Sequence, residues 1–276
     1  MALIQVNYLS KALMRTVPLN VILPVDKISF MTMDYSMEDG KKFKTLYLLH
    51  GIFGNYTDWV SGTRIQRWAE EKNLCVVMPS GDNAFYVNGV IPVNNYEEFV
   101  GKELVEITRK MFPLSDKRED TFIAGLSMGG YGALHTGMKY SDTFGYIGAL
   151  SSAASILDRK DSLLGVSAVF GDYDEAVKSD KNLHVLIREL SDRVKAQKTT
   201  APEFFVACGL QDSLLESNRS LRKELETEGF KVEYLEEDGA HEWDFWDRNI
   251  KRVVDWLPLG NTDVTVTSGS VTKEKK

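Results

Sequence analysis

The sequence predicts a doubly wound α/β fold, in which a mostly parallel sheet is covered by helices on both faces. Two patterns alternate along most of the 276 residues: short apolar, β-branched or aromatic runs, and longer stretches with apolar residues at helical spacing. Strand and helix in repetition favour a parallel sheet, because each helical crossover returns the chain to the same sheet edge. No repeat or composition break interrupts this pattern, which predicts one domain over residues 1–258.

Seven strands and six helices are expected in this order along the chain. The apolar runs predict strands at residues 18–24, 44–50, 74–79, 120–126, 144–151, 203–209 and 230–236. The helical patterns are TRIQRWAEEKN, YEEFVGKELVEITRKMF, the segment after Ser127, LHVLIRELSDRVKAQ, SNRSLRKELETEG and WDFWDRNIKRVVDWL. Residues 152–182 have the least regular pattern between two strands and are predicted as a cap insertion. Residues 259–276 are polar and rich in Ser and Thr, which predicts a disordered tail.

Composition excludes several classes of protein. The chain has 33 Lys and Arg against 40 Asp and Glu, a formal charge of −7, and so offers no polybasic surface for nucleic acid or anionic membranes. No apolar run is long enough to span a bilayer, and the amino-terminal segment lacks the pattern of a signal peptide. Cys75 and Cys208 each lie in an apolar run, which favours buried, reduced thiols and a cytoplasmic location. The composition is compatible with both a monomer and a homo-oligomer.

The strongest motif is FIAGLSMGGYG, residues 122–132, which places Ser127 between Gly125 and Gly129. The motif follows an apolar strand directly and precedes a helical pattern, as in a nucleophile elbow. Such a turn holds the serine in a strained conformation, and the glycines remove side chains that would collide there. Ser127 is therefore predicted as a nucleophile.

A serine hydroxyl needs a base, and the chain has four histidines. His135 lies more than two turns along the helix that follows Ser127 and cannot reach back. His184 begins an amphipathic helix, and His50 precedes the serine in the loop after a strand. His241 follows a strand and a turn, at the carboxyl end of the sheet where such sites form, and is the predicted base.

An acid should orient the histidine, and elbow enzymes use the chain order Ser, Asp or Glu, His. Asp212 fits best, because it follows the strand EFFVACG in a GLQDS turn. Asp238 is the first competitor, but it shares the loop of the histidine. Asp172 and Asp174 have no strand directly before them.

Backbone amides are expected to bind the developing oxyanion. One is the amide of Met128, which follows the nucleophile at the positive end of a helix. The other belongs to the loop HGIFG after the strand at 44–50, and is assigned to Ile52, with Phe53 as the alternative.

Two further segments are less decisive. Asp82, Asn83 and Tyr86 in the loop MPSGDNAFYVNG either contact substrate or form a solvated loop. Trp243 is near enough to the histidine in sequence to line a pocket, whereas Trp246 is assigned to the core. No metal-binding motif, clustered His and Asp set, dinucleotide fingerprint or phosphate loop is found, so no metal and no cofactor are expected.

Several segments together resemble the esterase D-like branch of the α/β hydrolases, and most of all its bacterial tributyrin esterases. They are SKALMRTVPLNVILP, LLHGIFGNYTDW, MPSGDNAFYVN, AGLSMGGYGALHTGMKY, GLQDSLLESNRSLRKEL and GAHEWDFWDRNIKRVVDWLP. The resemblance implies a triad of Ser127, Asp212 and His241, with oxyanion donors at Ile52 and Met128. It also implies hydrolysis of short-chain acyl esters. Relatives include S-formylglutathione hydrolases and acetyl xylan and feruloyl esterases.

The expected function is a carboxylesterase that acts on a small-molecule ester through an acyl enzyme. A thioesterase of the S-formylglutathione hydrolase type is the alternative, although this chain has HGIFG where those enzymes tend to have SGLTC. Acyl transfer to an acceptor other than water and a non-catalytic binding protein are the remaining readings.

Overall fold

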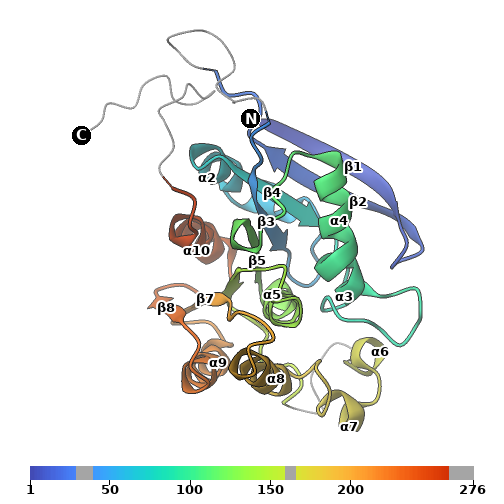
Figure 1. Cartoon of the computed structure of the whole chain (residues 1–276). Coiled ribbons are helices and arrows are strands. Elements are labelled where there is room, and N and C mark those ends of the chain that lie inside the picture. Colours follow the sequence, from blue (N-terminus) through green and yellow to red (C-terminus); the bar gives the residue numbers. More distant parts are fainter. Residues whose placement is uncertain (29–39, 159–165, 261–276) are drawn as a thin grey trace.

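The computed structural model describes residues 1–28, 40–158 and 166–260, in which eight strands form one sheet (Figure 1). The strand order is β1-β2-β4-β3-β5-β6-β7-β8. β1 pairs antiparallel with β2, β2 pairs antiparallel with β4, and all other neighbours are parallel. The strands are β1 Ala2–Ser10, β2 Arg15–Leu23, β3 Lys44–Leu49, β4 Leu74–Pro79, β5 Thr121–Leu126, β6 Tyr146–Leu150, β7 Glu203–Gly209 and β8 Val232–Glu237.

Helices cover both faces of this sheet. The helices are α1 Asp58–Gly62, α2 Ile65–Glu71, α3 Tyr96–Glu98, α4 Leu104–Met111, α5 Met128–Lys139, α6 Val166–Phe170, α7 Tyr173–Ala176, α8 Leu183–Lys195, α9 Leu215–Thr227 and α10 Trp243–Trp256. A π-helical turn, Phe99–Glu103, joins α3 to α4, and a 3₁₀ turn covers Arg118–Asp120. Figure 1 shows α2 and α10 on one side of the sheet and α4 and α5 on the other. The doubly wound prediction is confirmed.

Alternate residues of the central strands point to opposite faces, which divides the core in two. Tyr47 and Leu49 of β3 belong to the cluster under α4, α5 and α8, whereas Leu46 and Leu48 belong to the cluster under α2 and α10. Because both faces are covered, the central strands are apolar at nearly every position, which is why they are recognisable as continuous runs.

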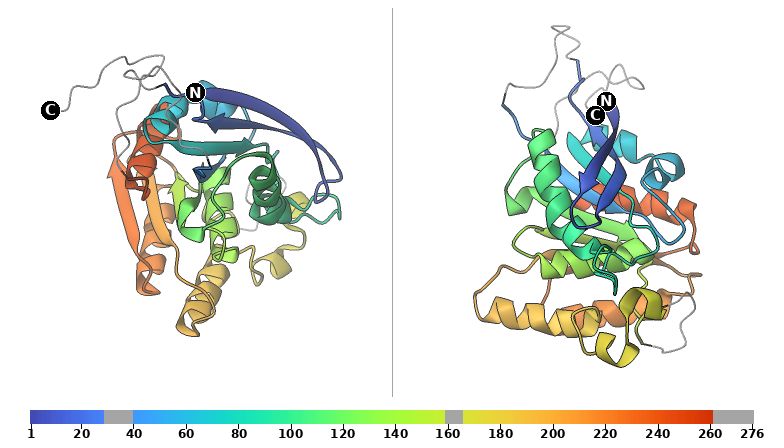
Figure 2. Two further views of the ribbon diagram at one scale, coloured as in Figure 1. Left: turned by 45° about the horizontal axis from the view of Figure 1, so that its top comes forward. Right: turned by 90° about the vertical axis from the view of Figure 1, so that its right-hand side faces the viewer.

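The first strand, β1, was not predicted from the sequence. β1 lies at the edge of the sheet and pairs only with β2, with Ala2 opposite Leu23 and Ser10 opposite Arg15. Most of its side chains alternate between partly buried and exposed, so its apolar residues never form a continuous run. The long hairpin that β1 and β2 form stands out in both views of Figure 2.

The single helix expected from YEEFVGKELVEITRKMF is also interrupted. Its middle is the π-helical turn, in which Gly101 lies against Tyr140 so closely that an added Cβ would be 2.3 Å from the ring. Such turns insert one residue into a helix without breaking it, and apolar periodicity does not reveal them.

Cys75 and Cys208 are free and buried, in β4 and β7. None of the helices in the described part of the chain is both long and apolar enough to cross a membrane. Residues 261–276 of the predicted tail and residues 159–165 of the predicted cap insertion lie outside the described residues. The described part of that insertion contains α6 and α7.

The turn between β1 and β2 depends on one carboxylate. Glu103 accepts hydrogen bonds from the backbone amides of Lys11, at 3.0 Å, and Ala12, at 2.8 Å. Glu103→Ala should lower the free energy of unfolding by about 1–3 kcal/mol, because two amides lose their acceptor. Urea denaturation measures the effect. Glu106→Ala, at an exposed position of α4, is the control, and equal losses in the two variants would contradict this role of Glu103.

Candidate active site

The turn between β5 and α5 holds Ser127 in an unusual conformation. Its φ and ψ angles are 53° and −115°, a region that residues with a side chain rarely adopt. The amide of Ser127 donates to the Leu150 carbonyl at 2.9 Å, which ties the turn to β6. The side chain is therefore presented at the amino-terminal end of α5.

Two glycines allow α5 to start so close to the sheet. A Cβ on Gly125 would lie 2.3 Å from the Gly129 carbonyl oxygen, and one on Gly129 would lie 2.4 Å from the Leu49 carbonyl oxygen. Both obstacles are backbone atoms and cannot rotate away. The glycine spacing of the motif is thus a packing requirement of this turn.

Ser127, His241 and Asp212 are joined by hydrogen bonds. The Ser127 hydroxyl donates to Nε2 of His241 at 2.9 Å, and Nδ1 of His241 donates to Oδ2 of Asp212 at 2.9 Å. The three residues follow β5, β8 and β7, so they meet at the carboxyl edge of the parallel strands. The Asp212 side chain is fully buried, whereas 36% of the His241 side chain is exposed.

The surroundings of Asp212 favour its ionised form. Burial works against ionisation, but hydrogen bonds from His241, from the Leu214 amide at 2.9 Å and from the Ser151 hydroxyl lower the pKa of Asp212 below its ordinary value. The carboxylate is therefore held as an acceptor, with its charge directed at the imidazole.

Trp246 is buried in the core, as predicted, but its contact with the imidazole and the part played by Ser151 were not predicted from the sequence. Trp246, assigned to the core, packs edge-to-face with His241 at 4.9 Å between ring centres, and its indole nitrogen donates to Oγ of Ser151 at 3.2 Å. Trp243, which is near enough in sequence to line a pocket, is partly buried and packs edge-to-face against Trp246 and Trp59. Trp246 lies about one helical turn further along α10, which brings it back over the imidazole. In the sequence, only this helical spacing could have predicted the contact between Trp246 and His241.

The loop after β3 contains Ile52, one of the two predicted oxyanion donors. Among the described residues, the amides of Ile52 and Met128 have no hydrogen-bond acceptor, whereas the Phe53 amide donates to Oδ1 of Asn83 at 2.8 Å. A Cβ on Gly51 would lie 3.5 Å from Cβ of Ser127, so this loop passes directly beside the serine. The Phe53 amide is therefore already paired in this structure, whereas the Ile52 amide is not paired with any described residue.

The other histidines lie away from the serine hydroxyl and have other partners or surroundings. His50 is buried, and its Nε2 accepts from the Gly81 amide at 2.8 Å, which fixes the loop after β4 against the loop after β3. Burial lowers the pKa of His50, so its imidazole is neutral. His184 pairs with Glu224. Among the acids, Asp238 accepts from Gln211 at 3.5 Å, and Asp172 caps α7.

The loop after β4 is only partly available to a ligand. Tyr86 is fully buried and donates to the His50 carbonyl at 3.0 Å, so the suggestion that it contacts substrate is wrong. Asp82 and Asn83 do reach the surface, where both line a small cavity.

One cluster of candidate metal ligands corrects the expectation that His and Asp residues do not gather. Ligand atoms of Glu97, His135 and Asp180 lie within 4.8 Å of one another. Lys139 already donates to both carboxylates, at 2.8 Å to Glu97, so an ammonium group occupies the position of a cation. The sequence does not predict this cluster, because its three residues come from separate segments of the chain.

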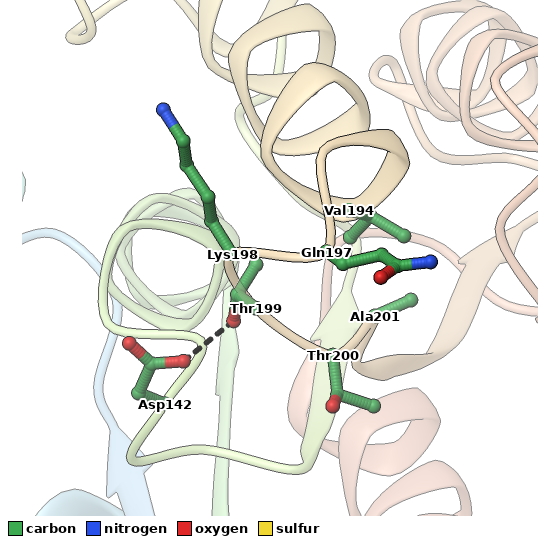
Figure 3. A pocket seen from close by; sticks show the side chains of 7 residues that line it. All are labelled: Asp142, Val194, Gln197, Lys198, Thr199, Thr200 and Ala201. Carbon is green, nitrogen blue, oxygen red and sulfur yellow. Dashed lines mark hydrogen bonds between the residues drawn. The ribbon is translucent and has the colours of Figure 1, made fainter.

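Two surface cavities differ in their relation to the serine. The larger, about 560 Å³, lies between the end of α8 and the start of β7. It is therefore at the amino-terminal ends of the parallel strands, whereas Ser127 lies at their carboxyl-terminal ends. Asp142, Val194 and residues 197–201 line it, and Oγ1 of Thr199 donates to Asp142 at 2.6 Å (Figure 3). The smaller, about 290 Å³, is lined in part by the loop after β4, where Asn83 accepts from the Phe53 amide of the loop after β3.

Comparison with known proteins assigns the family. The family model described as "Putative esterase" matches residues 10–257. An acetyl esterase of Caldicellulosiruptor saccharolyticus is 41% identical over 270 residues, which cover 93% of this chain and 98% of that protein.

Solved structures agree. A fluorophosphonate-binding serine hydrolase of Staphylococcus aureus, with substrate bound, has 32% identity and a TM-score of 0.80. An S-formylglutathione hydrolase of Staphylococcus aureus, as apoenzyme, has 31% identity and a TM-score of 0.78. Each comparison covers 93% of this chain and 98% of the other. The chain therefore belongs to this esterase family, has the α/β hydrolase fold and is a carboxylic ester hydrolase.

Proposed function

We propose that Ser127, His241 and Asp212 form the catalytic triad of a serine carboxylesterase that hydrolyses short-chain acyl esters. The observation that carries the proposal is the unbroken pair of hydrogen bonds from the Ser127 hydroxyl through His241 to the buried carboxylate of Asp212. The backbone amides of Ile52 and Met128 are the proposed oxyanion donors, since both flank the serine and neither has another acceptor among the described residues.

The mechanism follows from these positions. Oγ of Ser127 attacks the ester carbonyl carbon while Nε2 of His241 takes the hydroxyl proton. The tetrahedral oxyanion accepts from the two amides, and collapse expels the alcohol, which receives the proton from His241. Water then attacks the acyl enzyme with His241 as base, which releases the acid and restores the Ser127 hydroxyl. Asp212 stays ionised throughout and stabilises the imidazolium.

Short-chain acyl esters are the proposed substrate class, with tributyrin-like, acetylated sugar and phenolic acid esters as its members. The acetyl esterase relative supports a small acyl group. An S-formylglutathione hydrolase activity is the second candidate, favoured by the solved Staphylococcus aureus structure of that description. A cytoplasmic location belongs to the same proposal and is supported by two free, buried cysteines.

Ser127→Ala tests the nucleophile. Turnover should fall by about 10⁶, because no other group replaces the hydroxyl, while the melting temperature should hardly change. The measurement is turnover of purified protein on 4-nitrophenyl acetate, butyrate and octanoate, S-formylglutathione, acetylated xylan and methyl ferulate. Preference for the thioester would favour the second candidate. Equal turnover in both proteins would contradict the assignment of Ser127.

Asp212→Asn tests the acid. The amide keeps the shape of the side chain but loses the charge that fixes the imidazole tautomer, so kcat should fall by about 10⁴. The decrease is read from steady-state kinetics on 4-nitrophenyl acetate. Asp238→Asn is the comparison, because Asp238 is the nearest alternative in sequence and contacts Gln211. A larger decrease in Asp238→Asn than in Asp212→Asn would transfer the role.

Ser151→Ala tests how Asp212 is held. Loss of the hydroxyl removes one hydrogen bond that stabilises the Asp212 carboxylate and the acceptor of the Trp246 indole, so the carboxylate should be held less firmly against the imidazole and kcat should fall about tenfold. Steady-state kinetics on 4-nitrophenyl acetate measure the decrease. Ser152→Ala is the matched control, because it removes a neighbouring buried hydroxyl that has no hydrogen-bond partner within residues 1–28, 40–158 and 166–260. Equal kcat in the two variants would exclude this role of Ser151.

A further inference from the structure

A small polar pocket opens beside the loop that follows β3. Its volume is about 290 Å³, close to the lower end of ordinary ligand pockets. Its lining residues come from β2, from the loop after β4, from the first residue of α3 and from α6. We call it the polar pocket, and its lining includes Arg15, Asp82, Asn83, Asn94, Tyr96 and Val169.

The loop after β3 contacts both Ser127 and a residue that lines the polar pocket. Gly51 passes against Ser127, since a Cβ on it would lie 3.5 Å from Cβ of the serine. Two residues later, the Phe53 amide donates to Oδ1 of Asn83 at 2.8 Å, and Asn83 lines the pocket. Only Ile52 separates these two contacts along the chain. A molecule whose ester carbonyl rests on the Ile52 amide is therefore adjacent to the pocket wall.

The charged groups of the polar pocket are already arranged by the protein. Nη2 of Arg15 donates to the Asp82 carboxylate and to the Tyr96 hydroxyl, and the Tyr96 hydroxyl donates to the same carboxylate. Tyr96 is buried, while 43% of the Arg15 side chain and 55% of the Asp82 side chain remain exposed. Asp82 also has a φ of 44°, a strained conformation of the kind that gathers at functional sites.

This chemistry selects the kind of group that can enter. A hydrocarbon chain would remove water from the Arg15–Asp82 pair without replacing its hydrogen bonds, which is unfavourable. A group with several hydroxyls supplies donors for Asp82 and acceptors for Arg15, and the amides of Asn83 and Asn94 can serve as either.

We propose that the polar pocket binds the alcohol part of the substrate, and that this part is a polyhydroxylated ring such as a sugar. The inference rests on the proposed esterase function and narrows it: the small acyl group is attached to Ser127, while a sugar ring across the Ile52 loop supplies the leaving oxygen. The apolar wall at Val169 contacts the carbon face of such a ring.

Two acetate esters isolate the contribution of the hydroxyls. Methyl 6-O-acetyl-glucopyranoside and cyclohexylmethyl acetate both release acetate from a primary carbon on a six-membered ring, and only the first has ring hydroxyls. Acetate release gives kcat/KM for each. The native protein should prefer the sugar ester about tenfold or more, the effect of one or two hydrogen bonds to charged groups.

Three variants locate the preference. Arg15→Met and Asn94→Ala should each lower the ratio of the two kcat/KM values about tenfold, mainly through KM for the sugar ester. Lys198→Met is the control, because it removes a cation from the cavity at the opposite edge of the sheet and should leave the ratio unchanged. Melting temperatures establish that each variant folds, and Asn94→Ala leaves the ion pair intact.

The outcomes separate the two proposals. Equal kcat/KM on both esters in the native protein, or a ratio that Arg15→Met and Asn94→Ala leave intact, would overturn the sugar assignment. If Arg15→Met and Asn94→Ala lowered kcat/KM for methyl ferulate alone, the sugar assignment would also be overturned, because the pocket would then bind the acyl part of the substrate. If the Ser127→Ala variant still hydrolysed both acetate esters, the proposed esterase mechanism itself would be refuted.

Discussion

The contact on which the rest of the site depends is the approach of α5 to β3. Gly129 lies against the Leu49 and His50 carbonyl oxygens with no room for a side chain, and Gly125 lies against the Gly129 carbonyl. This approach forces Ser127 into its positive φ and directs the start of α5 at the loop after β3. Because β3, β4, β7 and β8 end at the same edge, the loops that surround the serine follow from the sheet order.

Much of this arrangement is predictable from the sequence, for a physical reason. Strands covered on both faces must be apolar throughout, so β3 to β7 appear as continuous runs and their order fixes the edge where loops meet. The glycines around Ser127 are recognisable because steric exclusion permits no other residue. Chain order then reduces the choice of base and acid to His241 and Asp212, whose chemical roles remain a proposal.

Other features depend on contacts between distant segments. The Asn83 side chain that occupies the Phe53 amide, and the Ser151 hydroxyl between Trp246 and Asp212, involve residues whose own neighbours in sequence give no signal. β1 was missed because an edge strand can remain half exposed and needs no apolar run. Glu97, His135 and Asp180 likewise meet only through the packing of α3, α5 and the segment before α8.

The reactivity of the two cysteines can be used to measure local opening of the sheet. Burial raises the pKa of the Cys208 thiol to about 12 and raises that of Cys75 further, so neither forms a thiolate in the closed structure. Cys75 lies in β4 and Cys208 in β7, on opposite sides of β5. The rate at which each thiol reacts with an alkylating reagent therefore measures how often its half of the sheet opens, without any label on the chain.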